Sequence, residues 1–159
     1  MKRIIGFLSA SLIILSVVSS QASATTTQLP PAQLLKSLLE KHKGDVIYLD
    51  FWASWCSPCR QSFPWLNSMQ ETYQGQGFNV ISVNLDANYS LATDFLKETP
   101  VLFSVVFDPK GKTAKQYKVK GMPTSYLINR EGVIVKGHTG FFPDKIPTYE
   151  SEIKQLMQQ

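Results

Sequence analysis

The sequence has only two cysteines and two histidines among its 159 residues. Two cysteines are too few for the disulfide framework of a small secreted scaffold. A structural zinc site needs about four ligands, and the two histidines, His42 and His138, lie 96 residues apart, without the spacing of a zinc motif. Covalent haem attachment through a CxxCH motif is excluded, because Arg60 follows the second cysteine. The sequence therefore predicts no metal site and no bound cofactor.

The chain also has no strong excess of charge of one sign. It carries 16 basic and 12 acidic residues, and two of the basic ones, Lys2 and Arg3, belong to the N-terminal segment considered next. Without those two, the balance is 14 basic against 12 acidic residues, a formal charge of +2. Such a balance favours neither nucleic acid nor an anionic membrane surface as a partner.

No apolar run is as long as a typical membrane-spanning helix. The longest, residues 4–18, is shorter than the roughly 18 to 20 residues that span a bilayer. It follows Lys2 and Arg3 and precedes the small-residue sequence Ala22-Ser23-Ala24. A charged start, a short apolar run and an A-x-A site are the three parts of a secretory signal.

These features predict a signal peptide at residues 1–24 and one exported domain at residues 25–159. A domain of this length can bury a core without disulfide support. We expect it in the periplasm, where a cysteine pair can be oxidised. The alternative is an uncleaved signal that tethers the domain to the inner membrane, since no cysteine near the cleavage site could carry a lipid.

Short β-rich runs alternate with amphipathic helical patterns along this domain, and two β runs follow one another near its end. We expect strands at residues 46–52, 78–85, 103–107, 124–129 and 133–138, and helices at residues 31–43, 57–73, 89–97 and 145–157. Residues 112–117 should form a short helix or a turn. The segment Arg130-Glu131-Gly132 predicts a hairpin between the last two strands. This order predicts an α/β fold with helices around a central mixed sheet, without internal repeats.

Both cysteines lie in the segment DFWASWCSPCRQSFPW, residues 50–65, at the junction of a predicted buried strand and a predicted helix. A disulfide across only two intervening residues closes a loop too small to stabilise the fold much. Metal binding and haem attachment are disfavoured as well. Redox use of Cys56 and Cys59 is therefore favoured.

The spacing places Cys56 at the N-terminus of the helix and Cys59 one turn later on the same face. Unpaired backbone N–H groups and the helix dipole stabilise a thiolate at that N-terminus. We therefore interpret Cys56 as the attacking thiolate and Cys59 as the thiol that resolves the mixed disulfide. Pro58 fixes the first helical turn and removes an N–H group that has no partner within the helix.

The motif WCSPC after a strand ending in DFWAS, with GMPTSYLI at residues 121–128 and then Gly140, resembles the thioredoxin superfamily. The segment 89–107 is similar to the insertion of its exported TlpA/ResA-like branch. The resemblance covers nearly all of residues 25–159. It implies a thioredoxin-like fold and thiol:disulfide oxidoreductase activity without a bound cofactor.

The resemblance also implies roles for single residues. Cys56 matches the nucleophile, Cys59 the resolving thiol, and Pro123 the cis-proline that faces the pair. A cis bond there would turn the backbone of Met122 toward an extended substrate strand. Trp55 matches an active-site position and could form an apolar collar with Trp52, although aromatic residues near a strand end more often belong to the core.

Asp50 matches the buried aspartate of cytoplasmic thioredoxins, where the TlpA/ResA branch often has asparagine. Its apolar surroundings should raise its pKa, which suits a proton acceptor for Cys59. The alternative is a carboxylate hydrogen-bonded at a strand end. The chain departs from the family patterns at two positions: Ser62 replaces a frequent glutamate of the branch, and Ser82 lies where thioredoxins have a lysine.

The resemblance favours a monomeric reductant of protein disulfides, kept reduced by a membrane thiol-transfer protein. In a ResA-like role its substrate would be the cysteines of apocytochrome c. One alternative is an envelope oxidant of the DsbA type, disfavoured because that family inserts a helical domain that 135 residues cannot easily hold. Another is a non-catalytic module that binds copper or thiols.

Two further features have simple interpretations. We expect His138 on a surface of the sheet. A run of lysines could steer an acidic partner or form a solvated face; it comprises Lys110, Lys112, Lys115, Lys118 and Lys120.

Overall fold

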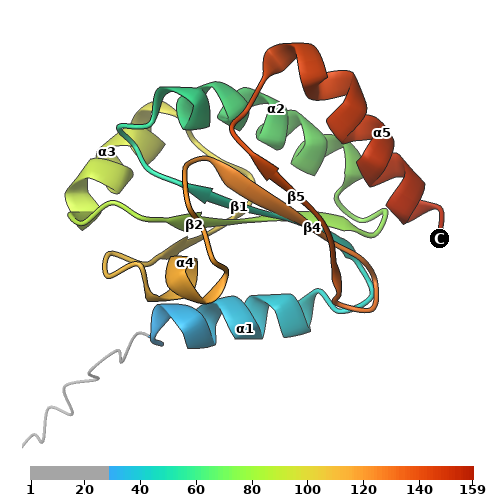
Figure 1. Ribbon diagram of the computed structural model, residues 1–159, viewed down its shortest axis with the longest axis horizontal. Coiled ribbons are helices and arrows are strands. Elements are labelled where there is room, and N and C mark those ends of the chain that lie inside the picture. Colours follow the sequence, from blue (N-terminus) through green and yellow to red (C-terminus); the bar gives the residue numbers. More distant parts are fainter. Residues whose placement is uncertain (1–28) are drawn as a thin grey trace, which may run out of the picture.

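A five-stranded mixed sheet forms the centre of the computed structural model, which describes residues 29–159 (Figure 1). The strands are β1 (Val46–Trp52), β2 (Phe78–Asn84), β3 (Ser104–Phe107), β4 (Thr124–Ile128) and β5 (Ile134–Thr139). Their order across the sheet is β3-β2-β1-β4-β5. The strands β1, β2 and β3 are parallel to one another, whereas β4 is antiparallel to both β1 and β5. The signal peptide expected at residues 1–24 lies outside the described residues.

Helices cover both faces of the sheet (Figure 1). One face packs against α1 (Pro31–Lys41) and α4 (Lys112–Gln116), the other against α2 (Ser57–Tyr73), α3 (Tyr89–Glu98) and α5 (Ile146–Met157). Each helix and strand expected from the sequence is present, with ends that differ by at most two residues. The predicted α/β fold with a central mixed sheet is confirmed.

The central strand β1 is buried along its whole length, as its apolar sequence predicts. Because side chains alternate across a strand, Tyr48 and Trp52 join the core on the α2 face, while Leu49 and Phe51 join the core on the α1 face. Trp52 has no exposed surface, and its ring centroid lies 4.6 Å from that of Phe63. Trp52 is therefore a core residue, the second of the two interpretations open from the sequence.

Among residues 29–159, no helix is both long and apolar enough to cross a membrane.

Candidate functional site

The cysteine pair lies where β1 ends and α2 begins. Cys56 is the N-cap residue of α2, and its sulfur accepts a hydrogen bond from the backbone N–H of Cys59 at 3.3 Å. The two residues form a disulfide bond, with their Cα atoms 5.3 Å apart. The structure thus places both sulfur atoms at the positive end of the helix dipole.

The two cysteines differ in accessibility. Cys56 is 6% exposed, whereas Cys59 has no exposed surface. A partner protein can therefore approach only the sulfur of Cys56. This difference suits an attacking Cys56 and a Cys59 that acts after the first bond has formed.

An aspartate that belongs to no recognisable motif, Asp86, holds the loop before Cys56. The Asp86 carboxylate accepts hydrogen bonds from the backbone N–H and the hydroxyl of Ser54, at 2.9 and 3.1 Å, and from the side-chain amide of Asn84 at 2.7 Å. Asp86 is only 2% exposed. It fixes the loop between β1 and α2 to the end of β2. The only signal for it in the sequence is an acid directly after the predicted strand at residues 78–85.

Asp50 lies in the middle of the sheet, beneath α2. It is 2% exposed and points to the same face of β1 as Tyr48 and Trp52, the face whose core includes Cys59. Its Oδ2 atom has no hydrogen-bond partner. Burial raises the pKa of the Asp50 carboxyl well above its ordinary value. Burial also raises the pKa of the Tyr48 hydroxyl, and the nearby Asp50 charge raises it further.

The polar neighbours of Asp50 have other partners. Ser82 and Ser125 are its cross-strand partners on β2 and β4. The Ser82 hydroxyl accepts a hydrogen bond from the Trp52 indole at 3.2 Å, and the Ser125 hydroxyl lies 2.7 Å from that of Tyr48. Asp50 Oδ2 therefore lacks the hydrogen bond that the alternative interpretation requires.

Ser62, the residue at the position of the family glutamate, offers no carboxylate. It is buried, and its hydroxyl donates a hydrogen bond to the carbonyl of Cys59 at 2.8 Å. Ser82, at the position of the thioredoxin lysine, is fully buried. Asp50 thus has neither of the two charged neighbours that the related families would place beside it.

Met122 and Pro123 lie next to the cysteine loop. Thr124, the first residue of β4, pairs with Phe51 near the end of β1. Met122 and Pro123, which precede Thr124, therefore lie at the same end of the sheet as the loop that carries Cys56. The Met122–Pro123 peptide bond is cis. The Pro123 carbonyl accepts a hydrogen bond from the Gly140 N–H at 2.8 Å. Pro123 is buried and Met122 is half-buried.

Two exposed aromatic side chains lie in the segments around this site. Trp55, directly before Cys56, is 68% exposed, and Phe142 is 47% exposed. The Phe142 ring packs over Gly140, where an added Cβ would lie 3.0 Å from it. Because the Gly140 N–H donates a hydrogen bond to the Pro123 carbonyl, Phe142 belongs to the part of the site around Pro123, called here the proline side. No motif in the sequence marks Phe142 as part of the site.

His138 lies on β5, yet it is half-buried rather than on an open surface of the sheet. Its Nε2 atom lies 2.8 Å from the Glu152 carboxylate, and its ring centroid lies 4.9 Å from that of Tyr149. Both partners belong to α5, which covers this part of β5. His138 therefore links β5 to α5.

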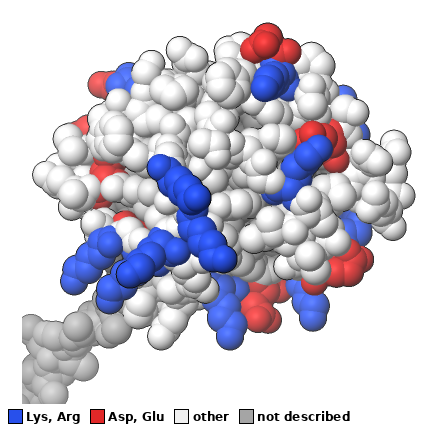
Figure 2. Space-filling model, viewed as in Figure 1, with Lys and Arg blue, Asp and Glu red and all other residues white. Residues whose placement is uncertain are grey.

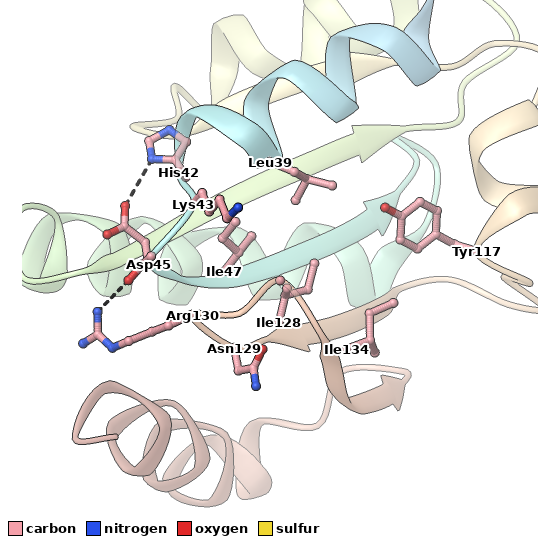
Figure 3. A pocket seen from close by; sticks show the side chains of 12 residues that line it. Leu39, His42, Lys43, Asp45, Ile47, Tyr117, Ile128, Asn129, Arg130 and Ile134 are labelled. Atoms are coloured by element: carbon pink, nitrogen blue, oxygen red, sulfur yellow. Dashed lines mark hydrogen bonds and ion pairs between the residues drawn. The ribbon is translucent and has the colours of Figure 1, made fainter.

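Within the described part of the chain, no group of three or more histidine, cysteine or acidic side chains could hold a metal ion. A pocket lies between the end of α1 and the β4–β5 turn (Figure 3). It is near the start of β1, whereas the cysteines follow the end of that strand. Its polar side chains have structural partners: His42 lies 3.3 Å from Asp45, and Arg130 donates hydrogen bonds to the carbonyls of Gly44 and Met157. We assign this pocket no part in the redox site.

Comparisons with known proteins agree with this geometry. A family model described as Redoxin matches residues 19–155. The chain is 31% identical over 130 residues to sporulation thiol-disulfide oxidoreductase A of Bacillus subtilis (strain 168), a match that covers 77% of this chain and 79% of that protein. It is 36% identical over 98 residues to thiol-disulfide oxidoreductase ResA of the same organism, covering 62% of this chain but only 55% of ResA. The chain thus spans about half the length of ResA.

Solved structures share the fold. A Chlorobium tepidum protein assigned as a thiol:disulfide interchange protein DsbE is 52% identical, with a TM-score of 0.73 over 75% of this chain and 84% of that chain. StoA of Bacillus subtilis is 31% identical, with a TM-score of 0.58 over 73% of this chain and 82% of that chain. The fold is therefore thioredoxin-like, and the chain belongs to the redoxin family, within which it is similar to the ResA and StoA thiol-disulfide oxidoreductases.

Proposed function

We propose that this protein is an exported thiol-disulfide oxidoreductase that reduces disulfide bonds of other proteins. The observation that carries the proposal is the placement of Cys56 as the N-cap residue of α2, with the fully buried Cys59 one turn behind it. The similarity to relatives named thiol-disulfide oxidoreductases also supports the proposal.

The reaction starts from the reduced pair. The Cys56 thiolate attacks one sulfur of a partner's disulfide, forms a mixed disulfide and releases the other partner sulfur as a thiolate. Cys59 then loses its proton and attacks the sulfur of Cys56, which releases the second partner sulfur and forms the Cys56–Cys59 disulfide. Two electrons pass to the partner, and the oxidised state that results is the one in this structure.

Asp50 accepts the proton of Cys59 in this proposal. A buried thiol cannot lose its proton directly to water, and the Asp50 carboxylate lies on the same face of the sheet as Cys59. Its raised pKa brings it closer to the pKa of a thiol, which makes the transfer less unfavourable. The unpartnered Oδ2 atom supplies the acceptor.

The substrate lies along Met122 and Pro123 in this proposal. An extended segment next to the partner's cysteine would pair with the backbone of Met122, as in β-strand addition. The exposed Trp55 would supply apolar contact on the other side of Cys56.

The signal peptide predicted at residues 1–24 supports export, and we propose the periplasm as the site of action. In that oxidising space a reductant needs a source of electrons, and we propose a membrane thiol-transfer protein in that role. We propose the cysteines of apocytochrome c as a substrate, which the family resemblance of the sequence implies for a ResA-like role.

The reduction potential of the Cys56–Cys59 couple tests the proposed direction. The protein without residues 1–24 is equilibrated in graded thiol buffers, and tryptophan fluorescence reports the fraction reduced. We expect a value near or below about −250 mV, typical of a reductant. A value near about −120 mV would mean that the protein forms disulfides instead. Tight stoichiometric copper binding to the reduced protein, without disulfide reductase activity, would contradict enzymatic function itself.

A further inference from the structure

Residues 109–123 contain five lysines and no acidic residue. All five are exposed; they are Lys110, Lys112, Lys115, Lys118 and Lys120, called here the lysine patch. Figure 2 shows basic side chains gathered over α4 and the chain that follows it. Among the ion pairs of residues 29–159, none involves a member of the patch.

The sheet topology places the lysine patch at the redox end of the molecule. Strand β3 is parallel to β2 and ends at Phe107, opposite Asn84. Strand β4 begins at Thr124, opposite Phe51 near the end of β1. The segment between β3 and β4 therefore lies at the same end of the sheet as the loop that carries Cys56.

Two acidic residues at this end, Asp108 and Asp86, do not neutralise the patch at the surface, and the exposed Asp144 forms no ion pair with it. Asp108 is 1% exposed, and its carboxylate accepts hydrogen bonds from the backbone N–H groups of Lys112, Thr113 and Ala114 at 3.1, 2.6 and 3.3 Å. Asp86 is also buried and binds Ser54 and Asn84. Both carboxylates are used inside the fold, while the ammonium groups face solvent.

The small net charge of the chain hides an asymmetry. Outside the patch, residues 29–159 carry nine basic and twelve acidic side chains. Positive charge is thus concentrated at the redox end, and the remainder carries a slight excess of acid. Such an arrangement orients a charged partner during its approach and raises the rate of productive encounters.

We propose that the lysine patch docks an acidic face of the protein whose disulfide reacts with Cys56. This inference rests on the proposed function and specifies the class of substrate. A protein is favoured over an anionic membrane because the patch leads directly into Met122 and Pro123, which lie at the same end of the sheet as Cys56.

The test uses two disulfide-bonded peptides that differ only in four glutamates or four lysines beside the cysteines. The rate constant kcat/KM for each is divided by that for hydroxyethyl disulfide, a small uncharged substrate, which corrects for changes in thiol reactivity. At low salt we expect about a tenfold preference for the acidic peptide. It should decline above about 0.1 M salt, where the Debye length is about 10 Å.

Two double variants that change the net charge by the same amount test whether the peptide preference depends on the lysine patch. Lys112→Glu with Lys120→Glu should remove or invert the preference for the acidic peptide. Lys41→Glu with Lys43→Glu, which alters exposed lysines at the opposite end of β1, should retain it. Equal loss in both double variants would overturn the proposal, because only net charge would then matter.

Other outcomes separate this inference from the proposed function. If hydroxyethyl disulfide is reduced but the two peptides react equally at every salt concentration, the docking proposal alone fails. If neither peptide nor hydroxyethyl disulfide is reduced, the proposed function fails, and the docking proposal with it. Patch-dependent sedimentation with phosphatidylglycerol vesicles, without a charge preference between peptides, would overturn the proposal in favour of a membrane.

Discussion

The sulfur of Cys56 accepts a hydrogen bond from the backbone N–H of Cys59 at 3.3 Å, within the first turn of α2. The donor belongs to the backbone, so it is present in both the oxidised and the reduced protein. When the disulfide is open, the same N–H can stabilise a thiolate on Cys56, while the side chain of Cys59 stays buried. The backbone thus distinguishes the two cysteines before any partner binds.

Substitution of each cysteine should therefore give a different result. Cys56→Ser should abolish reductase activity, because no attacking thiolate remains. Cys59→Ser should still attack and should accumulate a mixed disulfide with the substrate, detectable by mass spectrometry under non-reducing conditions. The double variant, Cys56→Ser with Cys59→Ser, is the control and should trap nothing. Normal substrate release by Cys59→Ser would contradict the resolving role.

Asp50→Asn should stabilise the oxidised protein at neutral pH. The substitution removes a buried carboxyl group whose Oδ2 atom lacks a partner and which is costly to ionise inside the fold. The gain should be about 1–3 kcal/mol in the free energy of unfolding. The same variant should resolve mixed disulfides more slowly, because the proton acceptor is lost. Urea denaturation and the decay of the mixed disulfide measure the two effects.

The stabilisation should depend on pH with a definite sign. The pKa of Asp50 is raised in the folded protein, so the folded state holds this proton more tightly than the unfolded chain. Wild-type stability is then lost as pH rises from about 3.9, the pKa of an unfolded aspartate, through the folded value. The advantage of Asp50→Asn should grow across this window and then level off. Glu71→Gln, an exposed control on α2, should show no such growth, and an advantage that shrinks with pH would contradict the assignment.

Asp86→Ala should loosen the loop before Cys56. The change removes the acceptor for the backbone N–H and hydroxyl of Ser54 and for the amide of Asn84. Leaving these donors without a partner should lower the free energy of unfolding by about 2–4 kcal/mol. Asp94→Ala, which removes an exposed acid on α3, serves as the control. A loss for Asp86→Ala no larger than for the control would mean that the loop does not depend on these hydrogen bonds.

The sequence predicts the helices and strands of this fold well because its signals are local. Hydrophobic periodicity and glycine or proline breaks mark the elements, and the observed ends differ by at most two residues. The short 3-10 helix Pro143–Lys145 was not predicted. A single turn of this kind has no periodic pattern to detect.

The parts of the site that the sequence does not reveal depend on contacts between distant segments. Cys56 and Cys59 are recognisable because their chemistry and their position at a helix start are both encoded within a few residues. Asp86 reaches Ser54 across 32 residues, and Phe142 joins the site through the Gly140–Pro123 hydrogen bond. His138 is half-buried because α5 packs over it, which no local pattern around β5 reports.

Gly140 supports the proline side of the site through two separate properties, and a matched pair of substitutions can distinguish them. Its φ of +81° lies in the region that favours glycine, and an added Cβ would lie 3.0 Å from the Phe142 ring. Gly132 has nearly the same φ, +80°, but nothing lies within 4 Å of its Cβ position. Gly132→Ala should therefore lower the free energy of unfolding through backbone strain alone, by about 1–2 kcal/mol.

Gly140→Ala should cost more than Gly132→Ala and should also affect the reaction. The added methyl group must displace the Phe142 ring, which packs beside the segment that binds Pro123. We expect kcat/KM for a peptide disulfide to fall several-fold relative to hydroxyethyl disulfide in Gly140→Ala, with no change in this ratio in Gly132→Ala. Equal losses of stability together with an unchanged ratio would show that the position of Phe142 matters neither to the fold nor to the binding of substrate.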